Sequence, residues 1–182
     1  MSHVALIDPA HTTPDRAELL SQVHQAFGAV PHMFRAVANS PAALRSMWGS
    51  FGALGGGTLP AKLGEQIAVA VADRNGCDYC LAAHTALGRK AGATAEEMAA
   101  AQGGHAADEP TAAVLAFALA LVEQRGHVDV AQVQRLRAAG FGDEGLVEIV
   151  AHVALNLFTN YVNVALDVPV DFPKVALRAR AA

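Results

Sequence analysis

The stretch Glu65–His84, EQIAVAVADRNGCDYCLAAH, is the most informative segment of this 182-residue chain. Apolar residues recur at helical spacing up to residue 72, and Asn75-Gly76 is a pair that ends helices in the left-handed conformation. The next helix is expected to begin at about residue 78. The stretch also holds both cysteines of the sequence, Cys77 and Cys80, in a C-x-x-C arrangement. We therefore expect two helices joined by a tight turn, with the cysteines at the start of the second helix.

The rest of the chain also predicts helices. Several expected starts carry an N-cap residue followed by proline, as at Ser40-Pro41, or a capping box, as at Thr94 with Glu97. Glycine follows the last apolar residue of most of these segments. The longest predicted helix covers roughly 144–166. We find no convincing strand and expect an all-α protein with about eight helices.

The last helix shares a pattern with the cysteine stretch. Aligning Glu65 with Glu148 places Cys77 on Asn160 and Cys80 on Asn163. This alignment indicates an internal two-fold repeat in which asparagines replace the cysteines. A chance match between two alanine-rich helices explains the pattern equally well, and the sequence leaves both interpretations open.

Composition and length bound the class of protein. Hydrophobic residues make up 53% of the chain, charged residues make up 16%, and the net charge is −4. The surplus of apolar surface favours burial between subunits, and the scattered basic residues argue against nucleic-acid binding. The N-terminal segment lacks the regions of a secretory signal, and no uninterrupted apolar run reaches the roughly 18 residues that span a bilayer. We expect a cytoplasmic homo-oligomer with no membrane partner.

The chain length predicts a single domain over residues 1–182. Within it, we expect residues 1–12 and 167–182 to form extended arms, because both segments contain prolines and lack helical periodicity. The expected core around the C-x-x-C motif is residues 58–103.

The position of the cysteines suggests thiol chemistry. Free N–H groups at a helix N-terminus favour a thiolate, but the helix dipole contributes only ~0.3–1 kcal/mol. Lowering a thiol pKa from about 8.5 to about 6.5 takes roughly 2.7 kcal/mol, so a specific partner is required. His84 lies four residues after Cys80 on the same helix face and can accept the thiol proton. Glu65 would return beside the cysteines if the two helices form an antiparallel hairpin, and a buried glutamate there would need the histidine or a thiol as its partner.

Two other interpretations of this motif stay open. The cysteines could be buried apolar residues without a function. Alternatively, Cys77, Cys80 and His84 could bind zinc, with Glu65 or water as the fourth ligand. The sequence has no second C-x-x-C and no histidine pair that would complete a closed structural site.

A polar stripe runs along the last predicted helix. Glu148, His152, Asn156 and Asn160 recur every four residues, and Asn163 follows three residues later. Such spacing places these side chains on one side of an otherwise apolar helix. We favour a hydrogen-bonded stripe at a helix or subunit interface over the wall of an active site.

Together with Glu65, Cys77-Asp78-Tyr79-Cys80 and His84, several other segments resemble the alkylhydroperoxidase D-like proteins of the carboxymuconolactone decarboxylase superfamily. These segments are PHMF at 31–34, SPAAL at 40–44, Leu59-Pro60 and AHVALNLFTNYVNVALDVPVDFP at 151–173. The resemblance covers most of the chain. It implies an orthogonal bundle of helical hairpins, assembled as a dimer, trimer or hexamer.

The resemblance also implies an antioxidant thiol peroxidase with a redox-active disulfide. Cys80 would attack an alkyl or hydrogen peroxide, Cys77 would resolve the sulfenic acid as a disulfide, and Glu65 and His84 would relay protons. No cofactor is implied, and a lipoyl- or thioredoxin-type dithiol would act as the electron donor. Two alternatives are a lactone decarboxylase that uses Glu65 and His84, and a zinc-binding or redox-sensing protein without enzymatic activity.

Overall fold

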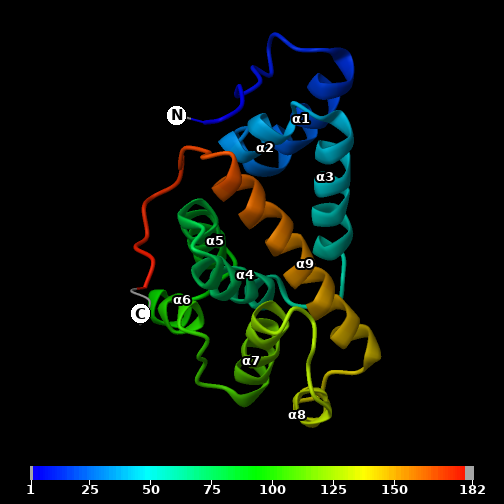
Figure 1. Cartoon of the computed structure of the whole chain (residues 1–182), viewed down its shortest axis with the longest axis vertical. Helices are drawn as coiled ribbons and strands as arrows, with labels where there is room; N and C mark the ends of the chain where they lie inside the picture. The colour runs from blue at the N-terminus through cyan, green and yellow to red at the C-terminus, as the bar shows by residue number, and fades with distance from the viewer. Residues whose placement is uncertain (1, 179–182) are drawn as a thin grey trace.

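The computed structural model describes residues 2–178, and in that range the chain forms nine α-helices and no β-strand (Figure 1). The all-α prediction is confirmed, with one helix more than the approximate number expected. The helices are α1 (Pro14–Phe27), α2 (His32–Val37), α3 (Pro41–Gly55), α4 (Ala61–Asn75), α5 (Asp78–Lys90), α6 (Ala95–Gln102), α7 (Glu109–Glu123), α8 (Val130–Ala138) and α9 (Asp143–Ala165).

Helices α4 and α5 form the predicted hairpin. α4 ends at Asn75 because Gly76 adopts a φ of 70°, a left-handed conformation that glycine reaches without steric cost. Cys77 then caps α5, which begins at Asp78. One face of α4 buries Ile67 and its apolar neighbours. The hairpin therefore places the start of α5 inside the hydrophobic core.

Helix α9 packs along this hairpin and crosses the molecule diagonally from α8 to α2 (Figure 1). Its 23 residues include the buried polar side chains Asn156, Thr159, Asn160 and Asn163. α9 has the length and apolar composition of a membrane span, unlike our expectation from uninterrupted apolar runs. A single helix of this kind is weak evidence for a membrane, because the core helix of a soluble protein meets the same criteria.

The predicted internal repeat would require similar local structure in two regions. α9 is unbroken at residues 158–159, which the alignment places opposite the turn at 75–76. The two segments therefore differ in structure at this point, and the repeat stays a prediction.

The two segments predicted as arms contain no helix in their described parts, residues 2–12 and 167–178. The C-terminal arm is held against α2, where the backbone N–H of His32 donates to Asp171 Oδ2 at 2.8 Å. Phe172 packs edge-on against Tyr79, with ring centroids 5.8 Å apart. The arm therefore covers the N-terminal end of α5. Met1 and residues 179–182 lie outside the described range.

Candidate active site

The two cysteines lie side by side at the N-terminus of α5. Cys77 is the N-cap residue, and its sulfur accepts a hydrogen bond from the backbone N–H of Cys80 at 3.2 Å. Both thiols are free and buried. The helix end therefore brings its N–H groups to the sulfurs, as its sequence position predicted.

The surroundings separate the pKa values of the two thiols. Burial raises the pKa of Cys80, but the hydrogen bond with Cys77 and the charge of His84 act against it. With the further help of Asn163, these interactions lower the Cys80 pKa from 9.0 to about 7. The hydrogen bond with Cys80 and burial both raise the pKa of Cys77. Near neutral pH, Cys80 is therefore the thiol that ionises.

The hairpin brings Glu65 and His84 together. Glu65 Oε2 lies 2.7 Å from His84 Nδ1, across the α4–α5 contact. Burial lowers the pKa of His84, but the charge and hydrogen bond of Glu65 outweigh this effect, and the net pKa is raised. This ion pair favours the protonated imidazole, and the charge of the imidazolium favours the Cys80 thiolate. The predicted proximity of Glu65 to the histidine is confirmed.

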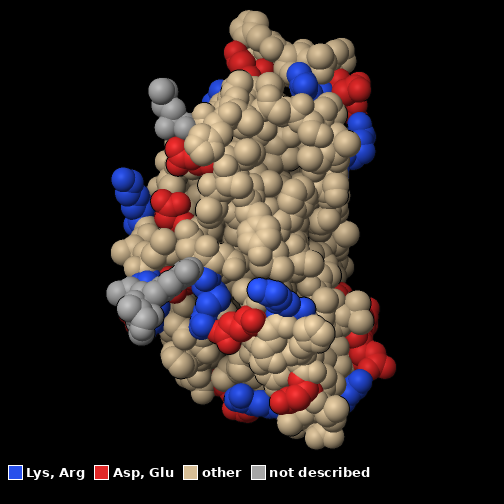
Figure 2. Space-filling view, viewed as in Figure 1, with Lys and Arg blue, Asp and Glu red and all other residues tan. Residues whose placement is uncertain are grey.

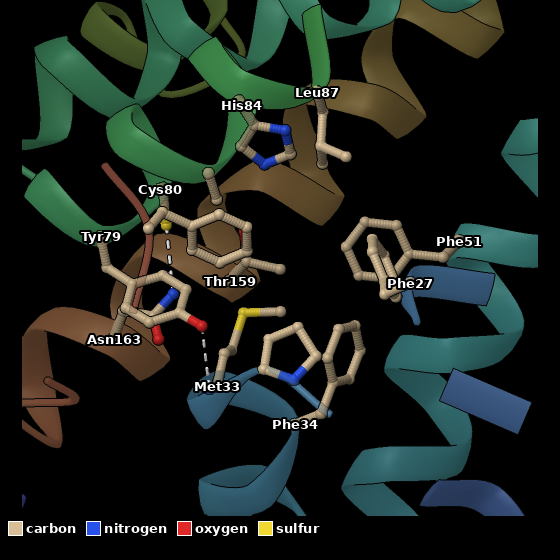
Figure 3. Close-up of a pocket in the computed structure, with 13 residues that line it drawn as sticks. Phe27, Met33, Phe34, Phe51, Tyr79, Cys80, His84, Leu87, Thr159 and Asn163 are labelled. Carbon is tan, nitrogen blue, oxygen red and sulfur yellow. Dashed lines mark hydrogen bonds between the residues drawn. The ribbon is translucent and has the colours of Figure 1, made fainter. Parts of the chain in front are cut away.

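The hydrogen bond to the Cys80 sulfur comes from α9. Asn163 Nδ2 donates to Cys80 Sγ at 3.2 Å, which Figure 3 marks with a dashed line. Asn160, one turn earlier, accepts from Asn75 Nδ2 at 2.8 Å, and its own amide also lowers the Cys80 pKa. Two elements far apart in sequence therefore stabilise one thiolate.

A small cavity opens in front of Cys80 and His84 (Figure 3). Its volume is about 30 Å³, enough for a water-sized molecule. Tyr79 is held beside it by the backbone N–H of Met33, which donates to the phenol oxygen at 3.2 Å. The wall is mostly apolar, and its aromatic members are Phe27, Phe34, Phe51, Tyr79 and Phe172.

A second, larger cavity lies on the other side of the ion pair. Its volume is about 210 Å³, and it shares Phe51 and His84 with the first cavity. Glu65 and His152 contribute polar atoms to its wall. The Glu65–His84 pair therefore separates an apolar cavity in front of the thiolate from a more polar one behind it.

The geometry bears on the zinc alternative. Across residues 2–178, no three His, Cys, Asp or Glu side chains come close enough together to hold a metal ion. The nearest candidates are Cys77, Cys80 and His84, and Nδ1 of the histidine is already bonded to Glu65. The zinc interpretation stays an alternative that these contacts do not decide.

Helix α9 contributes more to the site than we expected from the sequence. We favoured an interface for the polar stripe, and Asn163 at its end does contact the α4–α5 hairpin, through its hydrogen bond to the Cys80 sulfur. Phe51 lines both cavities, whereas Trp48 packs edge-on against Phe34 with ring centroids 5.7 Å apart. The regular spacing of polar side chains along α9, which ends at Asn163, was the pattern in the sequence that could have indicated its place in the site.

Comparison with known proteins agrees with this geometry. The profile of the carboxymuconolactone decarboxylase family matches residues 41–124. An uncharacterized protein of Cupriavidus necator is 35% identical over 88 residues, which are 48% of this chain and 73% of that protein.

Solved structures share the whole fold. A peroxidase-related protein with an alkylhydroperoxidase D core, from Ralstonia eutropha JMP134, is 25% identical, with a TM-score of 0.83 over 93% of this chain and 92% of that one. The debrominase Bmp8, in a C82A variant bound to 2,3,4-tribromopyrrole, is 22% identical, with a TM-score of 0.79 over 94% of both chains. The identity to this second structure is low enough that it shows the fold alone.

Fold and site together define an all-α protein with an alkylhydroperoxidase D-like architecture and a buried pair of cysteines. The chain belongs to the carboxymuconolactone decarboxylase family, as its sequence pattern indicated. The relative from Ralstonia eutropha JMP134 supports a peroxidase-related function at the level of the family.

Proposed function

We propose that the protein reduces alkyl or hydrogen peroxides with Cys80 as the attacking thiol and Cys77 as the resolving thiol. The observation that carries the proposal is that the Cys80 sulfur and the His84 imidazole line the same cavity, with Glu65 behind the histidine. A peroxide in this cavity would meet a nucleophile and a proton donor together. The apolar wall favours the organic part of an alkyl hydroperoxide over a polar group, although a group larger than the cavity's volume of about 30 Å³ would require the wall to move apart.

The first step oxidises Cys80. Its thiolate attacks one oxygen of the peroxide, the O–O bond breaks, and Cys80 becomes a sulfenic acid. The second oxygen leaves as alkoxide or hydroxide and takes a proton from the His84 imidazolium. The raised pKa of His84 and the lowered pKa of Cys80 both favour the charge states that this step requires.

The second step forms the disulfide. Cys77 attacks the sulfenic sulfur of Cys80, a sulfur–sulfur bond forms, and the hydroxyl leaves as water with the proton from the Cys77 thiol. The high pKa of Cys77 keeps that proton in place until the sulfenic acid forms. Both sulfurs pack around the N-terminus of α5, and this proximity supports Cys80 as the attacking thiol and Cys77 as the resolving thiol.

An external dithiol, of lipoyl or thioredoxin type, would then reduce the Cys77–Cys80 disulfide by two successive exchange reactions. We propose that no bound cofactor takes part, because the two thiols and the donor account for both electrons. We further propose a cytoplasmic location, where thiols are kept reduced between turnovers.

We also propose that the chain assembles as a homo-oligomer through the outer face of α9. Four apolar side chains on this helix are exposed, Val147 by 69%, Val150 by 45%, Tyr161 by 63% and Val164 by 53%. The face along which α9 runs carries few charged residues in its central part (Figure 2). Burial of this surface between copies would remove it from water.

The direct test of the peroxidase proposal is mass spectrometry after one equivalent of cumene hydroperoxide. We expect a Cys77–Cys80 disulfide in the native protein and a trapped sulfenic acid at Cys80 in Cys77→Ser. Cys80→Ser should consume no peroxide. Full peroxide consumption by Cys80→Ser would contradict the proposal. Turnover of a lactone that survives alkylation of both thiols would instead support the decarboxylase alternative.

The aromatic cavity also favours a second candidate, reductive removal of halogen from a small aromatic ring. The five aromatic side chains around Cys80 could enclose such a ring, and the structurally similar debrominase binds 2,3,4-tribromopyrrole as a C82A variant. The two thiols would supply the two electrons that replace bromine by hydrogen and release bromide. Release of bromide with formation of one disulfide per halogen removed would distinguish this reaction from peroxide reduction.

A further inference from the structure

The carboxylate of Glu65 interacts with two histidines that come from different helices, by a hydrogen bond with His84 and through its charge with His152. His84, on α5, is its ion-pair partner and borders the cavity at the thiolate. His152, on α9, lines the larger cavity together with Glu65. The peroxidase steps above use the first histidine and give the second one no role.

The position of His152 depends on a glycine in α4. A Cβ atom at Gly64 would lie 3.2 Å from Cε1 and 3.6 Å from Nδ1 of the imidazole. The ring therefore lies directly on the backbone of α4, beside the residue that precedes Glu65. A larger side chain at position 64 would push the ring away from the carboxylate.

No hydrogen bond to a described residue fixes the orientation of the His152 ring through its Nε2 atom. Its Nε2 atom is buried and has no hydrogen-bond partner among the described residues. Buried polar atoms are nearly always paired, so an unpaired ring nitrogen calls for a functional explanation. A ring held only by packing can turn toward a new partner when the charges around it change.

The charged groups that face His152 come from all three helices around it. Glu148 lies one turn earlier on α9, Glu65 lies on α4, and His84 lies on α5. Burial lowers the pKa of His152, the two carboxylates raise it, and the charge of His84 lowers it. These shifts, and the direct hydrogen bond of His84 to Glu65, favour the proton on His84 over His152.

Glu148 is already engaged elsewhere. Its carboxylate accepts hydrogen bonds from the backbone N–H of Thr58, at 2.8 and 2.9 Å, and from that of Leu59 at 3.0 Å. It fixes α9 to the segment that precedes α4. Glu65 is thus the carboxylate whose ion-pair partner changes its charge during the proposed reaction.

We propose that Glu65 pairs with the two histidines in turn, so that His152 takes up a proton from water in the larger cavity when His84 has given its proton to the leaving oxygen. This inference rests on the peroxidase proposal for the event that discharges His84. Loss of that proton leaves a partly buried carboxylate without a cation, which is unfavourable in a low-dielectric site. A proton on His152 restores the balance of charge, and it returns to water when His84 is protonated again.

His152 is therefore a positioning residue that acts on the reaction through Glu65. Three observations support this role: the ring lines the larger cavity together with Glu65, it packs on α4 at Gly64, and its buried Nε2 has no hydrogen-bond partner that would fix its orientation. Protonation of the two histidines should consequently be anticorrelated. This coupling can be measured without any substrate.

The test is an NMR titration of the histidine rings, with the His152 signal assigned by its absence in His152→Asn. In His84→Gln, which carries no positive charge, we expect the pKa of His152 to rise by about one pH unit, as expected for removal of a nearby like charge. In the double variant that combines His84→Gln with Glu65→Gln, this rise in the pKa of His152 should be absent. The exposed His105, which lines neither cavity, provides the internal reference signal.

An unchanged His152 titration in His84→Gln would overturn the proposal. If that variant does not fold, alkylation of Cys80 in the native protein gives the second measurement. Removing the thiolate lowers the pKa of His84, since the charge of Cys80 helps to raise it, and His152 should then titrate at higher pH. An unchanged pKa of His152 after alkylation would equally overturn the proposal.

Peroxide turnover provides a separate readout. We expect His152→Ala to lower kcat roughly tenfold with little change in KM, and free imidazole to restore much of the loss, since the larger cavity can admit it. A loss that imidazole does not restore would indicate a purely structural role. Absence of peroxide turnover in the native protein would refute the proposed function, whereas the titration would still test the coupling of the two histidines.

Discussion

The hydrogen bond from α9 to the attacking sulfur makes a quantitative prediction. Asn163 Nδ2 lies 3.2 Å from Cys80 Sγ, and Asn163→Leu removes this donor while keeping a side chain of similar size. The Cys80 pKa is lowered from 9.0 to about 7 in total. This lowering corresponds to about 2.7 kcal/mol, shared among Cys77, His84 and the two asparagines after burial has been overcome.

A donor to a charged acceptor contributes about 1.5 kcal/mol, or about one pKa unit. We therefore expect a Cys80 pKa of about 8 in Asn163→Leu. The thiolate fraction at pH 7 would then fall from about one half to about one tenth, and alkylation at this pH would slow about fivefold. At pH 10 both proteins should react at similar rates, because Cys80 is fully ionised in both.

The assay is the rate of reaction with iodoacetamide between pH 5 and 10, with mass spectrometry to assign the modified cysteine. Because the Cys80 pKa is lowered, the thiolate is present above pH 7 and is lost as the pH falls below it. Thr159→Val is the matched control, since its hydroxyl lines the same cavity but donates to the Asn156 carbonyl at 3.1 Å. A midpoint that stays near pH 7 in Asn163→Leu, or that rises equally in the control, would refute the reasoning.

Three further predictions concern the rest of the site and the surface. Glu65→Gln removes the carboxylate that raises the pKa of His84, so this pKa should fall. We expect peroxide kcat/KM to decrease about a hundredfold in stopped-flow kinetics at pH 7. An unchanged rate would count against a role for the ion pair. Phe172→Ala should enlarge the smaller cavity and raise kcat/KM several-fold for cumene hydroperoxide but not for hydrogen peroxide. Equal changes in kcat/KM for both peroxides would contradict a role of Phe172 in limiting substrate size. Tyr161→Glu should shift sedimentation toward a monomer, whereas Val130→Glu, an equally exposed site on α8, should not.

The sequence predicted those parts of the site that neighbouring residues determine. The position of Cys77 at the start of α5 follows from the preceding Asn75-Gly76 pair, which ends α4 through a left-handed glycine. The contact between Glu65 and His84 also follows, because a hairpin with so short a turn must bring the two helices together in one register.

The cavities were beyond prediction from the sequence. Their walls combine side chains from α1, α2, α3, α5, α9 and the C-terminal arm, and their shape depends on how these elements pack. Phe172 illustrates the point, because it lies in a segment without helical periodicity and reaches the site through contacts of the arm with α2.

The sequence by itself therefore determined the helices, the order of the two cysteines and the histidine that follows them. These features depend on capping, turn residues and spacing within about twenty positions of one chain segment. Only the tertiary structure decided which face of α9 meets the thiolate, because Asn163 is 83 positions away from Cys80 and its contact depends on the packing of α9 against the hairpin. The same packing places His152 beside Glu65, and so connects a polar stripe to the proposed chemistry of the Glu65–His84 segment.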